Sequence, residues 1–311
     1  MARKIILDID PGVADAVAAC LAINDSSLEV VALTATGGTV SPAQASRNVQ
    51  ALIEHLDPPR WPRLGVADDS QPLRTDGREL WGEDGFCGAP LRMAELHQQR
   101  PSTKVLVDEI RSAPGEVIVL CGGPLSNLAR ALRIEPDLAT QVGRLVIVGG
   151  TYSGPGDVTA AAEFNVYCDA AAAETVFSSP VTKTLIPLDV ANQVVLTYDL
   201  FNQLPPVSTH TGRLLRGLLP PAFQAFRHRL GIEGMLVPEA VGVVAILHPE
   251  LFVTELLPCE VETGGNVAHG ATIVDRRPRP GMPPNMEVAV AVRAEEAGKC
   301  IVRGLCQPEV C

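Results

Sequence analysis

The sequence predicts an α/β protein built on an open, mostly parallel sheet flanked by helices. Apolar runs of strand length alternate with segments of helical periodicity from the first residues onward. The strand-like runs are apolar nearly throughout, which is typical of strands buried on both faces of a parallel sheet. A chain of 311 residues can bury such a sheet, and no shift of composition divides it. We therefore expect one domain over residues 1–311.

The first two thirds of the chain read as strand-then-helix units. The predicted strands cover 5–10, 28–36, 116–121, 144–148 and 183–190, and the predicted helices cover 14–23, 42–56, 124–132 and 169–177. Ser41 followed by Pro42 is typical of a helix start, because the serine caps the first turn and proline lacks an N–H that would be unpaired there. Strands that alternate with helices in this way pair in parallel.

The last third of the chain differs in pattern. Residues 198–247 are predicted to be mostly helical. Glu255 to Thr263 and Glu287 to Val292 predict an antiparallel pair at the edge of the sheet, and Arg277 to Asn285 between them is a Pro/Gly-rich loop.

Composition limits the class of partner. The formal net charge of −11 argues against nucleic acid and anionic membranes, because both require a basic face. No apolar run approaches the ~20 residues of a membrane-spanning helix. The apolar stretch near the start stops at Asp8, too soon for a signal peptide. The eight cysteines are scattered without a C-x-x-C pair, which is typical of reduced thiols. These features predict a cytoplasmic protein.

Polar or glycine-rich residues follow four of the predicted strands, at 8–12, 36–39, 121–124 and 148–150. Ligands of open parallel sheets bind beyond the carboxyl ends of the strands. We therefore expect these four strand ends to form one binding site.

Three acidic residues lie close together at the first of these strand ends. Strand alternation places Asp8 and Asp10 on the same side, and the Pro11-Gly12 turn brings Asp15 back towards Asp10. Carboxylates at close range repel one another unless a cation lies between them, and hard oxygen ligands favour calcium or magnesium. An acidic residue there can also serve only as a helix cap or dipole partner. The tight turn and the third carboxylate favour the metal site.

The segment Ile6 to Ala16 resembles the opening signature of the inosine/uridine-preferring nucleoside hydrolases, D-x-D-P-G-x-D-D-A. Further pieces similar to that family follow in the same order over nearly the whole chain: Arg47-Asn48, Gly82 to Gly85, Gly123 to Ala129, Gly149-Gly150, Ala162 to Asn165, Pro187 to Val190, Val261 to Thr263, Gly270 and Asp275. The resemblance implies a nucleoside hydrolase-like fold.

The resemblance also implies a calcium site. The family positions that match Asp10 and Asp15 hold the ion, together with a main-chain carbonyl at the position of Ser126. The family's remaining ligand is an Asp in an H-D-P segment, where this chain has Glu239, so Glu239 is expected to serve. Asp8 is expected behind these ligands, where it orients them.

The activity implied is hydrolysis of the N-glycosidic bond of ribonucleosides. Calcium lowers the pKa of a water molecule, and Asp10 takes its proton, so that hydroxide attacks the anomeric carbon. The transition state resembles an oxocarbenium ion. Glu163 and Asn165 match family positions that bind the sugar, and Asp157 and Thr39 stand where the family has asparagines near the substrate.

Several positions depart from the family pattern. The second Asp of the opening motif, which the family uses on the ribose hydroxyls, is Ala14 here. The histidine of the H-D pair is Pro238, and Asn192 stands where the family has histidine in L-D-V-T-H. Together with Thr39, these changes predict weakened hydrolysis or an altered substrate, because each lost hydrogen bond to a buried charge costs about 1.5–3 kcal/mol.

The sequence also gives one weaker candidate residue, an expected oligomeric state and two alternative functions. His228 lies where the family often has a helix that contacts the base, so it is a candidate for the leaving-group side. Family membership implies a homodimer or homotetramer. One alternative is a catalytically weak relative that binds a small molecule. The other is a phosphatase of the D-x-D type, which Gly12 disfavours because that class has Thr or Val there, followed by a bulky residue.

Overall fold

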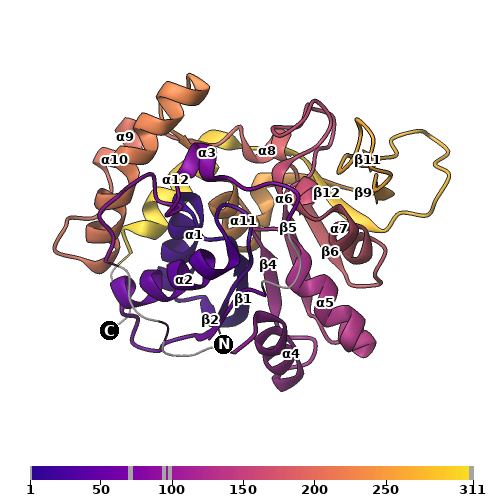
Figure 1. Cartoon of the computed structure of the whole chain (residues 1–311), viewed down its shortest axis with the longest axis horizontal. Helices are drawn as coiled ribbons and strands as arrows, with labels where there is room; N and C mark the ends of the chain where they lie inside the picture. The colour runs from indigo at the N-terminus through magenta and orange to yellow at the C-terminus, as the bar shows by residue number, and fades with distance from the viewer. Residues whose placement is uncertain (1, 69–72, 93–95, 97–99, 308–311) are drawn as a thin grey trace.

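The computed structural model describes residues 2–68, 73–92, 96 and 100–307. Its centre is an eight-stranded sheet in the order β3-β2-β1-β4-β5-β6-β12-β9 (Figure 1). The strands are β1 (Arg3–Ile9), β2 (Leu28–Ala35), β3 (Arg63–Gly65), β4 (Ile118–Cys121), β5 (Arg144–Val148), β6 (Lys183–Ile186), β9 (Phe252–Leu257) and β12 (Met286–Val292). All neighbours pair in parallel except β9, which is antiparallel to β12 at the edge. The mostly parallel sheet with an antiparallel edge pair confirms the predicted fold class.

Helices cover both faces of this sheet. The longer ones are α1 (Val13–Asn24), α2 (Pro42–Leu56), α4 (Ser102–Ser112), α5 (Ser126–Ile134), α7 (Ala170–Phe177), α10 (His210–Leu230), α11 (Pro238–Leu247) and α12 (Ala294–Leu305). The shorter ones are α3 (Arg78–Trp81), α6 (Phe164–Cys168), α8 (Leu188–Ala191) and α9 (Tyr198–Asn202), with 3-10 turns at Pro136–Thr140 and Pro249–Leu251. Two small antiparallel pairs lie outside the main sheet: β7 (Val195–Leu196) with β8 (Met235–Leu236), and β10 (Cys259–Val261) with β11 (Thr272–Val274).

Side-chain alternation along β1 divides the core into two layers. Ile5, Leu7 and Ile9 are buried against α1, α2, α10, α11 and α12 on one face. Ile6 points to the other face, where α4, α5 and α7 pack. Both faces are covered, which explains why the parallel strands are apolar throughout.

Two predicted strands differ most from the observed ones, and proline explains where each of them ends. The strand predicted over 183–190 ends at Ile186, because Pro187 lacks the N–H that would continue the ladder and instead precedes α8. The strand predicted over 255–263 begins earlier, at Phe252, and stops before Pro258. The chain then continues as β10, which pairs with β11 rather than with the main sheet.

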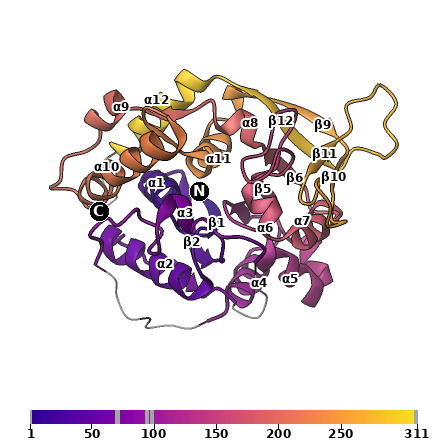
Figure 2. The same ribbon diagram turned by 45° about the horizontal axis from the view of Figure 1, so that its top comes forward.

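The carboxyl ends of the parallel strands lie on one side of the molecule, which is the top in Figure 1. In Figure 2, where this side comes forward, α3 lies in front of β1, between α10 on one side and α6 on the other. No helix among the described residues is long and apolar enough to cross a bilayer. The described cysteines form no disulfides.

Candidate functional site

A cavity of about 510 Å³ opens above the carboxyl ends of the strands. Its lining combines residues that are far apart in the sequence: Asp10, Ala14 and Asp15 from the first strand end, Thr39 after β2, Glu163 and Asn165 at α6, and Glu239 in α11. The volume falls in the range of sites that bury a small molecule. Three of the four predicted strand ends, at 8–12, 36–39 and 148–150, line the cavity, whereas the glycines of 121–124 pack against Asp10, Asp15 and Glu239 without lining it.

Asp10 lies just beyond β1, where its carboxylate is held by the loop after β2. Its Oδ2 accepts hydrogen bonds from the backbone N–H of Thr39 at 2.6 Å and from the Thr39 hydroxyl at 3.0 Å. Two glycines make room for it, since a Cβ on Gly38 would stand 2.2 Å from Oδ2 and a Cβ on Gly123 would stand 2.7 Å from Oδ1. Thr39 therefore contacts Asp10 directly and fixes its orientation.

Asp15 is the third residue of α1 and closes the turn that follows Asp10. Its Oδ2 accepts a hydrogen bond from the backbone N–H of Gly12 at 2.9 Å, as in a helix capping box. Its Oδ1 is buried and has no hydrogen-bond partner among the described residues. The helix cap thus uses one oxygen and leaves the other directed to the site.

Glu239 enters the same cluster from the first turn of α11. A Cβ placed on Gly122, at the end of β4, would stand 2.8 Å from Glu239 Cγ and 3.3 Å from Asp15 Oδ1. Glu239 is 9% exposed, and its Oε2 also lacks a partner within the described part of the chain. Gly122 is therefore the point at which Asp15 and Glu239, 224 positions apart in the sequence, come together.

The three carboxyl groups have perturbed pKa values. Burial raises the pKa of Asp15 to about 7. Burial and the charge of Asp15 raise the pKa of Asp10 well above its usual value, and burial with the charges of Asp15 and Asp10 does the same to Glu239. Buried carboxylates this close favour their protonated forms unless a cation offsets their charge.

Asp8 lies behind this cluster. It is buried on the face that α5 covers, and its Oδ1 accepts from the Thr34 hydroxyl at 2.6 Å and from Asn127 Nδ2 at 2.8 Å. Burial raises its pKa to about 6. Asp8 does not border the cavity. Its hydrogen bonds to Thr34 and Asn127 stabilise the end of β1, and it does not face a ligand.

Glu163 and Asn165 line the cavity beside the ends of β4 and β5. The Glu163 carboxyl caps α6 by accepting from the backbone N–H groups of Asn165 and Val166, and it also accepts from Gly150 N at 2.8 Å. Burial and the neighbouring charge of Asp157 raise the Glu163 pKa to about 8. Asn165 Nδ2 donates to the carbonyls of Gly122 (2.9 Å) and Val148 (3.1 Å), which ties the ends of β4 and β5 together.

The side chains of two predicted residues lie apart from this group, although the prediction for Ser126 concerned its main-chain carbonyl. Ser126 is the first residue of α5, and its hydroxyl donates to Asp169 Oδ2 at 2.6 Å. It borders a separate hollow of about 20 Å³ rather than the main cavity. His228 is exposed on α10 and does not line the cavity, whereas Phe226 and the exposed Arg229 and Leu230 of the same helix do. Asp157 does border the cavity, as an exposed residue at its mouth.

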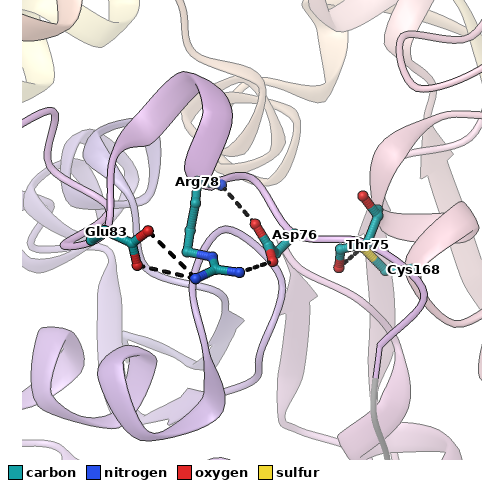
Figure 3. Close-up of polar contacts among 5 residues, drawn as sticks. All are labelled: Thr75, Asp76, Arg78, Glu83 and Cys168. Carbon is teal, nitrogen blue, oxygen red and sulfur yellow. Dashed lines mark hydrogen bonds and ion pairs between the residues drawn. The ribbon is translucent and has the colours of Figure 1, made fainter.

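The segment around α3 forms a rim that the sequence did not predict. Thr75, Asp76, Glu79 and Trp81 line the cavity there. Arg78 stabilises the segment by pairing with Asp76 at 2.8 Å and Glu83 at 3.1 Å, and Cys168 Sγ lies 3.7 Å from the Thr75 carbonyl (Figure 3).

The rim is joined to the floor and to α10. Asn48 Nδ2 donates to the Pro11 carbonyl at 2.9 Å and to the Asp84 carbonyl at 2.8 Å, which links the first turn to the segment after α3. The Trp81 ring contacts Phe226 edge-on, with centroids 5.4 Å apart. These contacts explain Asn48 and the Gly82 to Gly85 piece of the sequence, because they position the rim.

The donor set fits a hard divalent cation by its chemistry. Across the residues that the structure describes, no three His, Cys, Asp or Glu side chains are arranged so that they could hold a metal ion. Asp15 Oδ1 and Glu239 Oε2 are nevertheless buried oxygens without partners in this same region, and Asp10 lies beside them. Unpaired buried carboxylate oxygens are costly, and calcium prefers several oxygen ligands of this kind.

Comparisons with known proteins agree with this geometry. The profile of the family "Inosine-uridine preferring nucleoside hydrolase" matches residues 5–298. A non-specific ribonucleoside hydrolase RihC of Salmonella enteritidis PT4 is 34% identical over 293 residues, which cover 93% of this chain and 92% of the relative.

Solved structures agree as well. A plant nucleoside hydrolase, PpNRh1, superposes with a TM-score of 0.89 at 25% identity and covers 99% of this chain and 100% of its own. An inosine-guanosine nucleoside hydrolase gives a TM-score of 0.88 at 26% identity, over 99% of this chain and 100% of its own. The chain therefore belongs to the inosine-uridine preferring nucleoside hydrolases, which hydrolyse the N-glycosidic bond of ribonucleosides.

Proposed function

We propose that this protein is a calcium-dependent nucleoside N-ribohydrolase whose substrate preference differs from that of relatives with a full opening motif. The observation that carries the proposal is the group of buried carboxyls of Asp10, Asp15 and Glu239 on the floor of the cavity, two of which have an unpartnered oxygen. Asp10, Asp15 and Glu239 would hold the calcium ion, with the Ser126 carbonyl as the fourth ligand implied by the resemblance. A bound calcium ion would supply a Lewis acid that lowers the pKa of a water molecule.

The side chains of this protein would take up the proton of the attacking water and bind the sugar. Asp10 accepts the proton of the attacking water, and the two hydrogen bonds from Thr39 keep its carboxylate oriented for this step. Asn165 and Glu163 position the sugar, although backbone N–H groups already occupy the Glu163 carboxyl. Asp157 contacts the substrate at the mouth of the cavity.

The residues that depart from the family pattern lie in the part of the cavity that would bind the ribose. Ala14 is 4% exposed and borders the cavity beside Asp10 and Asp15, so a methyl group stands there instead of an acceptor. Pro238 and Asn192 also line the cavity, and the buried Asn192 Oδ1 has no partner among the described residues. The contacts available to a ribose therefore differ from those of a site with an acidic residue at position 14.

Ribose release from a panel of inosine, uridine, adenosine and cytidine, with calcium and with a chelator, tests the proposed function. We expect release that depends on calcium and is slow for the common ribonucleosides. Binding without any ribose release would favour the alternative of a catalytically weak binding protein. Phosphate release from an aryl phosphate, without ribose release, would favour a D-x-D phosphatase.

The stability of the calcium-free protein should fall as the pH rises from 5.5 to 8. Burial raises the pKa of Asp8 to about 6 and of Asp15 to about 7, whereas both titrate near 4 when unfolded, so the folded state binds more protons between about pH 4 and 7. We expect Tm to drop by about 4 °C or more over this interval. Saturating calcium should flatten the dependence, because it favours the ionised carboxylates. Thermal unfolding at several pH values, with Asp15→Asn as the matched variant, measures the effect. A calcium-free Tm that rises with pH would contradict it.

We further propose that the protein is a homodimer or homotetramer in the cytoplasm, as the family resemblance implies. Light scattering on the purified protein gives the mass of the assembly directly.

A further inference from the structure

The cavity carries mostly acidic side chains among the charged residues of its described lining, with one basic side chain. Its floor carries the carboxyls of Asp10, Asp15 and Glu239, whereas the α10 side presents Arg229 beside Phe226 and Leu230. Among the described lining residues, Arg229 is the only one with a basic side chain. The floor therefore favours positive charge on a ligand, and Arg229 is the single described lining residue that can pair with negative charge.

Helix geometry directs Arg229 to the cavity. Phe226, Arg229 and Leu230 are spaced i, i+3 and i+4, so they share one face of α10. Arg227 is on another face and pairs with Glu233 at 3.3 Å. Arg229 forms none of the hydrogen bonds or ion pairs found within the described residues. Its charge does act on the Cys87 thiol, and the Cys87 N–H bonds to the Trp81 carbonyl, so the guanidinium lies on the side of the rim segment.

Cleavage of an N-glycosidic bond requires stabilisation of the charge that develops on the ribosyl group and of the charge that develops on the base. Positive charge develops on the ribosyl group, and negative charge develops on the departing base. No His, Tyr, Cys or Lys borders the cavity in the part of the chain that the structure describes, so none of these can donate a proton to the base. An ionised carboxylate such as Glu79 at the rim would not stabilise an anion, and the Glu163 carboxyl already accepts hydrogen bonds from three backbone N–H groups. A guanidinium stays charged at all relevant pH values and offers five N–H donors and no acceptor.

We propose that Arg229 is a catalytic residue that binds the base and stabilises its departure as an anion. This inference rests on the proposed function. The C1′–N bond breaks with both electrons passing to the base nitrogen, the hydroxyl of water adds to C1′, and the proton of that water passes to Asp10. The base anion, paired with Arg229, then takes a proton from solvent. The matching substrates carry bases with carbonyl oxygens or ring nitrogens that accept hydrogen bonds, such as 6-oxopurines and uracil.

A substrate with an activated leaving group separates this role from a structural one. p-Nitrophenyl β-D-ribofuranoside releases a phenolate that is a stable anion and needs no help from Arg229. We expect Arg229→Gln to lower kcat/KM for inosine by about 10- to 100-fold. The same variant should change kcat/KM for the p-nitrophenyl riboside less than about threefold. Arg229→Lys should recover part of the loss on inosine. Arg227→Gln is the matched control, since it removes a guanidinium two residues away that does not line the cavity.

The outcomes are distinguishable. An equal loss on both substrates, or no loss on inosine, overturns the role of Arg229 while leaving the hydrolase activity in place. If the unsubstituted protein cleaves neither substrate, the proposed function fails and the inference fails with it. Unchanged Tm values for both Arg229 variants confirm that a loss on inosine does not come from misfolding.

Discussion

Replacement of Asp10 by Asn is expected to lower kcat/KM for nucleoside hydrolysis by about 10³- to 10⁴-fold and to weaken calcium binding. General-base catalysis alone contributes about 10²- to 10⁴-fold. An amide cannot accept the proton of the attacking water. Its NH₂ group, placed at Oδ2, would also face the N–H and hydroxyl of Thr39, which both donate to that oxygen. A flipped amide restores those bonds and turns its NH₂ group towards Gly123 and the site of the cation.

Ribose release and calorimetric titration with calcium measure the two effects of Asp10→Asn. Asp137→Asn is a suitable control, because it makes the same chemical change at an exposed position outside the cavity. Retention of more than about a tenth of the activity would show that another group takes the proton. Lost activity with unchanged calcium affinity would assign Asp10 to proton transfer alone.

Replacement of Ala14 by Asp is expected to raise kcat/KM for ribonucleosides by about 10- to 100-fold. A carboxylate at this position can accept hydrogen bonds from ribose hydroxyls, and each such bond is worth roughly 1.5–3 kcal/mol. Ala14 already borders the cavity, so the added group reaches the substrate. The new charge lies next to the buried Asp10 and Asp15, whose pKa values are already raised by burial, so the gain should require saturating calcium.

Two comparisons give the Ala14→Asp prediction its controls. Ala14→Asn has nearly the same shape without the charge and should give a smaller gain. 2′-Deoxy and 3′-deoxy nucleosides should gain less than ribonucleosides, because the hydroxyl that donates is missing. No gain in a variant that still binds calcium would place the defect jointly at Ala14, Thr39 and Pro238, and would favour a non-catalytic role. Brisk cleavage of inosine by the unsubstituted protein would mean that Ala14 is compensated elsewhere.

The sequence by itself determined the fold class and the residues of the acidic floor. Parallel strands buried on both faces are apolar throughout, and the start of α2 is set by local chemistry at Ser41 and Pro42. Asp10 and Asp15 are linked by a turn of a few residues, so their proximity is a local property. Glu239 lies far along the chain, and only the resemblance to a known family connected it to them.

The tertiary structure alone decided which side chains face the cavity. Successive residues of a helix differ by about 100° in direction, so the packing of α10 determines that Arg229 borders the cavity and His228 does not. The rim from Thr75 to Trp81 has no periodic pattern, and it reaches the site through long-range bonds such as that of Asn48 to the Asp84 carbonyl. Likewise, only the meeting of β4 and β5 gives the Asn165 amide its two carbonyl partners. Such contacts depend on how distant elements pack, and no local stretch of sequence contains that information.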